Sequence, residues 1–155
     1  MHTETPISKD YTESIRQRIH SYISDDPDAG HLIKAVYLFG SILNLDQFKT
    51  GSDVDLAYLI DPTRYKEDPL IHSSPAHMSA AEIGMLLNRQ TDVIVLNAAS
   101  IETAYQVVTT GIILYEADRG ERLEYESTVR GLYYDFKPFL QQLRQQRMLQ
   151  SPGRK

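Results

Sequence analysis

Two apolar segments joined by a polar loop most constrain what this chain can fold into. The first segment ends in Gly40-Ser41, and the second opens with Asp53-Val54-Asp55 after eleven intervening residues. Residues two apart on a β-strand project from the same face, so the carboxylates of Asp53 and Asp55 are expected to lie side by side. Adjacent carboxylates repel each other, and a divalent cation between them relieves that repulsion. The pair is therefore predicted to bind metal.

The Gly40-Ser41 turn is a candidate phosphate site. Glycine lets the backbone approach a ligand closely, and the turn can offer N–H groups and the Ser41 hydroxyl to a phosphate. Ser52, directly before Asp53, is a further candidate for nucleotide binding. Paired carboxylates beside such a turn are typical of phosphoryl or nucleotidyl transfer. On the residues alone, an Asp-x-Asp that merely marks a strand edge remains the alternative.

Length and composition favour a single domain and limit the partners that it can bind. The chain has 155 residues, 41% of them apolar, no cysteine and a formal net charge of −5. The lack of cysteine excludes disulfides and thiolate zinc sites and suits the cytoplasm. No apolar run approaches a membrane span. An acidic chain is a poor binder of nucleic-acid backbones, so we expect no direct nucleic-acid binding, whereas a metal ion could supply the positive charge that a nucleotide needs.

Hydrophobic periodicity predicts an α+β fold, a mixed sheet of about four strands flanked by helices. The whole chain, 1–155, is expected to be one domain with its core at about 30–118. Strands are expected at 32–39, 53–60, 91–96 and 112–115, and helices at about 12–23, 79–89, 100–110 and 119–150. Ser79 and Glu82 are typical of a capping box, and Pro138 is expected to kink or split the last helical region. The segment 63–75 is expected to be irregular, with at most one short helical turn near Tyr65.

Two further features each allow more than one interpretation. Asp92 opens the third predicted strand, where it could complete the metal site, act as a general base, or simply lie at a strand edge. The C-terminal region carries an apolar stripe, which could face the chain's own core or a partner protein. The stripe consists of Val129, Leu132, Tyr133, Phe136, Phe139, Leu140 and Leu143.

The Gly-Ser turn and the paired-aspartate strand resemble the signature of the DNA polymerase β-like nucleotidyltransferase superfamily. The run 91–118, followed by Tyr133-Tyr134-Asp135, is similar to the minimal nucleotidyltransferase (MNT) antitoxins, which are encoded beside small helical ribonuclease toxins of the HEPN type. The resemblance spans about 37–138. It implies a palm like that of polymerase β, with a long C-terminal helical region.

The resemblance also implies an activity. An antitoxin of this family transfers AMP from ATP to a tyrosine hydroxyl of its HEPN toxin, in a hetero-oligomer, with two Mg²⁺ ions. By this resemblance Asp53 and Asp55 would hold both ions and the ATP phosphates. Asp92 would bind the ion nearer the nucleophile and help to deprotonate the tyrosine, while Gly40 and Ser41 would seat the β- and γ-phosphates.

Departures from the family pattern keep two alternatives open. The loop is one residue longer than is usual, and Ile42-Leu43-Asn44 stands where Ala-Arg-Gly is common. Lys49 in this loop is a candidate triphosphate contact. One alternative is an enzyme that adenylylates small molecules such as aminoglycosides or lincosamides, although the chain has little length to enclose them. The other is a binding-only antitoxin that covers its toxin through the surface 133–143.

Overall fold

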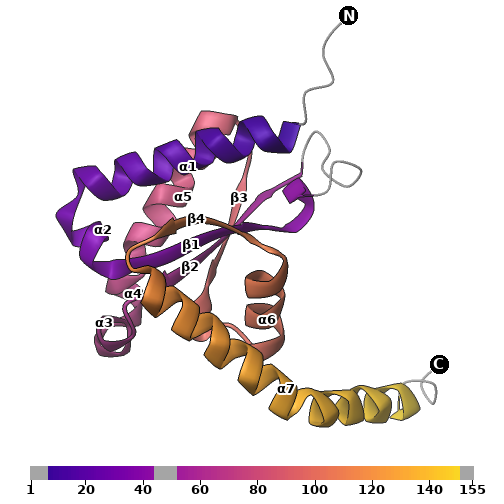
Figure 1. The fold of residues 1–155 in the computed structure, drawn as a ribbon. Coiled ribbons are helices and arrows are strands. Elements are labelled where there is room, and N and C mark those ends of the chain that lie inside the picture. Colours follow the sequence, from indigo (N-terminus) through magenta and orange to yellow (C-terminus); the bar gives the residue numbers. More distant parts are fainter. Residues whose placement is uncertain (1–6, 44–51, 151–155) are drawn as a thin grey trace, which may run out of the picture.

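A four-stranded mixed sheet forms the centre of the molecule (Figure 1). The computed structural model describes residues 7–43 and 52–150. The strands are β1 (Ile33–Phe39), β2 (Val54–Ile60), β3 (Thr91–Val95) and β4 (Ile112–Glu116), in the spatial order β3-β2-β1-β4. β1 pairs antiparallel with both β2 and β4, whereas β2 and β3 run parallel. Helices flank the sheet, so the predicted fold class is confirmed.

Alternation of side chains along the strands builds one core on each face of the sheet. On one face, α1 (Ile7–Asp25) and α5 (Ser74–Leu87) pack on residues such as Val36 and Leu56. On the other, α6 (Ile101–Thr110) and the first turns of α7 (Arg119–Gln150) pack on residues such as Tyr37 and Ala57. The period of two in a strand explains why neighbouring residues enter different cores. α1 extends the predicted helix 12–23 at both ends.

Short helices occupy two regions beside the sheet. α2 (Pro27–Leu32) leads into β1, and 3₁₀ turns η1 (Gly40–Leu43) and η2 (Leu96–Ala98) follow β1 and β3. The short helical turn expected near Tyr65 is part of α3 (Pro62–Glu67), but the expectation that the rest of 63–75 is irregular is wrong, since α4 (Pro69–His72) lies there. Each begins at a proline after an aspartate whose side chain accepts a backbone N–H, Asp61 from Arg64 and Asp68 from Ile71. Aspartate caps with proline at the first helical position favour a helix start.

The predicted start of α5 is also wrong. The helix begins at Ser74, and Ser79 lies inside it with 1% of its surface exposed. The Ser79 hydroxyl donates to the carbonyl of Ala76 at 3.2 Å, and its oxygen lies 2.6 Å from the Tyr58 hydroxyl. Ser79 therefore joins the helix to the sheet instead of capping it. Pro75, in the first turn, marks the true start.

α7 is a single helix of 32 residues that contains Pro138. The proline does not split it, and Figure 1 shows a change of direction in its C-terminal half. Of its apolar stripe, only Val129 is fully buried, at 4% exposed, whereas Leu132, Phe136 and Phe139 are 42%, 48% and 54% exposed. The stripe therefore leaves the core after its first turns. None of the helices in 7–43 and 52–150 combines the length and apolar character that a membrane span requires.

Candidate active site

The three aspartates singled out in the sequence come together at one end of the sheet. Asp55 and Asp92 are direct partners in the parallel register of β2 and β3. Asp53 immediately precedes β2, and its carboxylate influences that of Asp55. Asp53 and Asp92 are exposed, and Asp55 is half-buried. The arrangement leaves the carboxylates open to a ligand from outside.

The electrostatics of Asp55 show how closely these charges are placed. Burial, followed by the negative charges of Asp92 and Asp53, raises the pKa of Asp55 to about 6. Burial disfavours the charged form, and like charges disfavour it further. Carboxylate oxygens are the ligands that Mg²⁺ prefers, and a cation bound between these carboxylates would offset the repulsion among their negative charges. The three aspartates therefore fit a divalent ion in charge and chemistry. Within the described ranges, no three Asp, Glu, His or Cys side chains form a ready-made metal cluster.

Gly40 lies directly against the Asp55 carboxylate. Its φ is +87°, in the region that glycine tolerates, and a Cβ built there would collide with the Asp55 carboxyl group. The preceding residue, Phe39, pairs with Asp55 across β1 and β2. The turn after β1 and the carboxylates thus form one site, with Ser41 half-buried beside it. Their roles toward phosphate and metal stay predictions, and Lys49 and Asn44 lie outside the described residues.

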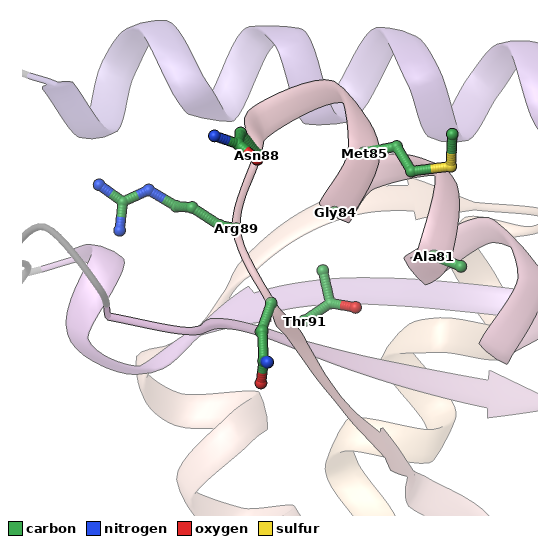
Figure 2. A pocket seen from close by; sticks show the side chains of 7 residues that line it. Ala81, Gly84, Met85, Asn88, Arg89 and Thr91 are labelled. Atoms are coloured by element: carbon green, nitrogen blue, oxygen red, sulfur yellow. The ribbon is translucent and has the colours of Figure 1, made fainter.

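Sequence reasoning missed the turn that joins α5 to β3. Arg89 donates from Nη1 to the carbonyl of Ser52 at 3.0 Å, and the Val54 amide donates to the carbonyl of Gln90 at 2.9 Å. Figure 2 shows the Arg89 side chain extending from this turn beneath α1. A cavity of about 610 Å³, lined by Ser52, Asp53, Arg89 and neighbours, opens there. The one signal for this turn in the sequence was the polar pair Asn88-Arg89, which shortly precedes Asp92 at the start of the third predicted strand.

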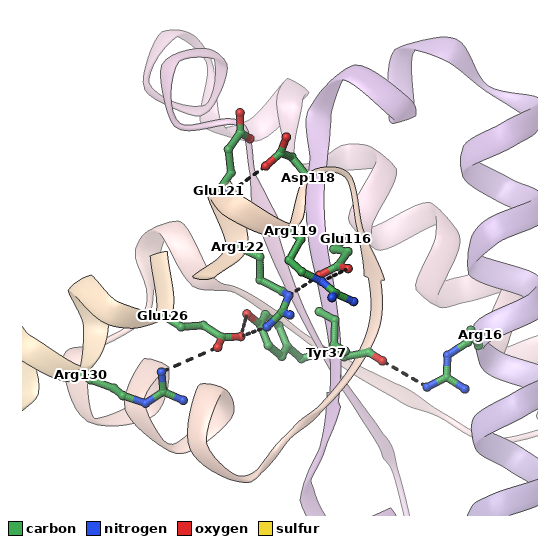
Figure 3. Close-up of polar contacts among 10 residues, drawn as sticks. Arg16, Tyr37, Glu116, Asp118, Arg119, Glu121, Arg122, Glu126 and Arg130 are labelled. Carbon is green, nitrogen blue, oxygen red and sulfur yellow. Dashed lines mark hydrogen bonds and ion pairs between the residues drawn. The ribbon is translucent and has the colours of Figure 1, made fainter. Parts of the chain in front are cut away.

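A buried ionic network fixes the start of α7 against the sheet (Figure 3). The Tyr37 hydroxyl on β1 donates to Glu126 at 2.7 Å, and Arg122 donates to Glu126 at 2.7 Å and to Glu116 at 2.5 Å. Burial, followed by the hydrogen bond to the Glu126 carboxylate, raises the pKa of Tyr37, so its hydroxyl stays protonated. The network holds together elements that cover the face on which the aspartates lie. Tyr37 lies far from Glu126 in the sequence, which hid this contact from pattern analysis.

Comparison with known families gives a match over most of the chain. Residues 17–120 match the family model described as "Polymerase beta, Nucleotidyltransferase". The matched segment contains Gly40, Asp53, Asp55 and Asp92. No curated protein matches the chain.

Solved structures with the same fold include several toxin–antitoxin complexes. A chain of a toxin–antitoxin crystal structure with AMP-PNP is 21% identical, with a TM-score of 0.61, covering 86% of this chain and 98% of that one. A chain of the MntA–HepT complex is 20% identical, with a TM-score of 0.59 and coverage of 88% and 98%. A chain of a tri-AMPylated Shewanella oneidensis HEPN toxin complex with MNT antitoxin is 21% identical, with a TM-score of 0.59 and coverage of 88% and 98%. At this identity the likeness establishes the fold.

Proposed function

Because the chain belongs to the polymerase β nucleotidyltransferase family, we propose that it is an antitoxin that transfers AMP from ATP to a tyrosine hydroxyl of a HEPN-type ribonuclease toxin. The observation that carries the proposal is the register of Asp55 with Asp92, with Gly40 against the Asp55 carboxylate. Carboxylates on adjacent strands beside a glycine turn suit the transfer of a nucleotidyl group.

Each residue of the site has a part in the proposed reaction. Asp53 and Asp55 would hold Mg²⁺, with Asp92 nearer the acceptor, and the bound cation would offset the phosphate charge and make the acceptor hydroxyl more acidic. The acceptor oxygen bonds to the α-phosphorus, the bond to the bridging oxygen of the β-phosphate breaks, and pyrophosphate leaves. A tyrosine hydroxyl has an ordinary pKa of about 10, so its proton needs an acceptor, and Asp92 would take it.

The exposure of the site favours a protein acceptor. Asp53 and Asp92 are open to solvent, so a bulky partner can cover them from outside. The complexes with similar folds include an AMPylated HEPN toxin and an AMP-PNP complex, which supports the choice of acceptor and of nucleotide. Gly40, Ser41 and Ser52 border the carboxylates and would contact the phosphates. Such a reaction belongs in the cytoplasm, where ATP and the RNA targets of a ribonuclease are found.

A second candidate function is favoured by the exposed stripe of α7. Leu132, Phe136 and Phe139 form an apolar face on the part of the helix that leaves the core. Aromatic side chains are enriched at protein interfaces, so this face suits the docking of a toxin. If docking alone neutralises the toxin, the protein is a binding-only antitoxin and its aspartates are dispensable for neutralisation.

One experiment separates these functions and the small-molecule alternative. The protein is incubated with Mg²⁺ and ATP labelled on the α-phosphate, together with either the product of the neighbouring gene or a panel of aminoglycosides and lincosamides. The proposal predicts label on a tyrosine of the gene product. Label on an antibiotic would identify a small-molecule enzyme. Full neutralisation of the toxin by an Asp53→Asn/Asp55→Asn double variant, without label, would identify a binding-only antitoxin.

A further inference from the structure

We propose that Arg89 is a positioning residue that fixes Asp53 relative to Asp92 and thereby sets the affinity of the site for metal. The proposal rests on the proposed function for the role of the aspartates. It starts from the place of Asp53, which is exposed and lies just outside β2, whereas Asp55 and Asp92 are paired within the sheet. The contacts of the two adjacent residues, Ser52 and Val54, therefore help to set the position of Asp53.

Those neighbours are held on both sides by consecutive residues of one turn. The carbonyl of Ser52, before Asp53, accepts from Arg89 at 3.0 Å. The amide of Val54, after Asp53, donates to the carbonyl of Gln90 at 2.9 Å. The same turn continues into β3, where Asp92 follows. The backbone on either side of one carboxylate is thus tied to the segment that carries another.

The turn itself is fixed to the end of α5. Asn88 has a left-handed φ of 53°, and the Arg89 amide donates to the carbonyl of Gly84 at 3.0 Å, which ends the helix. A Cβ on Gly84 would lie 2.8 Å from the carbonyl oxygen of Arg89, so this close approach requires glycine. The Thr91 hydroxyl donates to the carbonyl of Ala80 at 3.2 Å. The turn therefore has little freedom to shift.

The guanidinium of Arg89 also lies over an aromatic ring. Its central carbon lies 5.6 Å from the centre of the Tyr11 ring on α1, within the range of a cation–π contact. A planar guanidinium can stack on a ring and donate in its own plane to a carbonyl, whereas a lysine ammonium cannot do both in the same way. Asp53 and Arg89 also line the same cavity. These contacts specify arginine and not only a positive charge.

The test measures Mn²⁺ binding to the full chain, by titration with detection of free Mn²⁺ by electron paramagnetic resonance. Residues that orient metal ligands typically change metal affinity by about 10- to 100-fold when replaced. Arg89→Gln is therefore expected to weaken Mn²⁺ binding by about 10-fold or more, and Arg89→Lys is expected to fall between this variant and wild type. Arg64→Gln, an exposed arginine on α3 after the opposite end of β2, is the matched control and is expected to bind like wild type.

AMP transfer and thermal unfolding are measured on the same proteins. A purely structural role of Arg89 predicts a lower Tm with unchanged Mn²⁺ affinity in the folded protein, and that result would overturn the proposal. If Arg89→Gln does not fold, Arg89→Lys decides, and an affinity equal to wild type contradicts the proposal. If wild type binds Mn²⁺ and transfers AMP, and Arg89→Gln equals it in both measurements, this inference alone is refuted. If wild type neither binds Mn²⁺ nor transfers AMP, the proposed function is refuted and this inference with it.

Discussion

Replacing Asp55 by asparagine is expected to stabilise the protein at neutral and higher pH while it abolishes transfer. Burial and the charges of Asp92 and Asp53 raise the pKa of Asp55 from 3.8 to about 6. Between these two values the folded protein binds more protons at this site than the unfolded chain does. Stability therefore falls as the pH rises through this window, and above pH 6 the full destabilisation is present.

The expected size follows from the change in pKa. At 1.36 kcal/mol for each pKa unit, the rise from 3.8 to about 6 corresponds to about 3 kcal/mol. Asp55 is only half-buried, so solvent screening reduces this figure, and we expect about 1 kcal/mol. For a chain of this size, 1 kcal/mol shifts Tm by about 2–4 °C. Asparagine keeps the shape of the side chain beside Gly40 and removes the charge.

The assay is thermal unfolding of wild type and Asp55→Asn at pH 8 and at pH 4. The variant is expected to melt a few degrees higher at pH 8, and the difference should shrink at pH 4, where Asp55 of the folded wild type is protonated. Mg²⁺ at pH 8 should raise the Tm of wild type more than that of the variant, because binding to the folded state stabilises it. Asp135→Asn, at an exposed position on α7, serves as the control. A variant that is less stable at pH 8, or a difference independent of pH, would refute this reasoning.

Two further predictions concern the turn and the exposed helix. Gly40→Ala places a Cβ against the Asp55 carboxyl group at a φ of +87°. The variant should therefore lower the free energy of unfolding by about 1–3 kcal/mol in urea titrations, and it should impair AMP transfer. An unchanged free energy of unfolding would contradict this geometry. Phe136→Ser with Phe139→Ser should change stability by less than about 1 kcal/mol, since both rings are exposed. The same variant should weaken toxin binding about 10-fold or more in calorimetry; unchanged affinity would show that the partner binds elsewhere.

The placement of Asp53 and Asp55 beside Gly40 in the candidate site was largely predictable, because these residues follow local sequence patterns. An Asp-x-Asp at the start of a strand places two side chains on one face, and Gly-Ser at the end of the preceding strand brings a turn beside them. The register of Asp55 with Asp92 could not be read in the same way, since hydrophobic runs do not fix which strands pair or in which direction. Arg89 was missed because its hydrogen bond reaches Ser52, in a distant segment.

The wrong predictions about the fold arose because sequence spacing alone does not fix where a helix begins. Ser79 and Glu82 have the spacing of a capping box, but the same spacing occurs inside a helix, and Pro75 was the stronger start signal. The caps at Asp61 and Asp68 begin helices too short to show a period. The sequence of α7 is amphipathic whether its apolar stripe covers the chain's own core or a partner. Hydrophobic periodicity predicts that one face of a helix will be buried, but it does not identify the surface that covers that face.

The most direct test of the proposed chemistry compares AMP incorporation into the purified toxin by wild type, Asp53→Asn and Asp55→Asn, with ATP labelled on the α-phosphate and saturating Mg²⁺. Circular dichroism first confirms that each variant is folded. We predict that wild type labels the toxin and that each single variant loses this activity. Undiminished incorporation by both variants would remove Asp53 and Asp55 from the reaction and contradict the account.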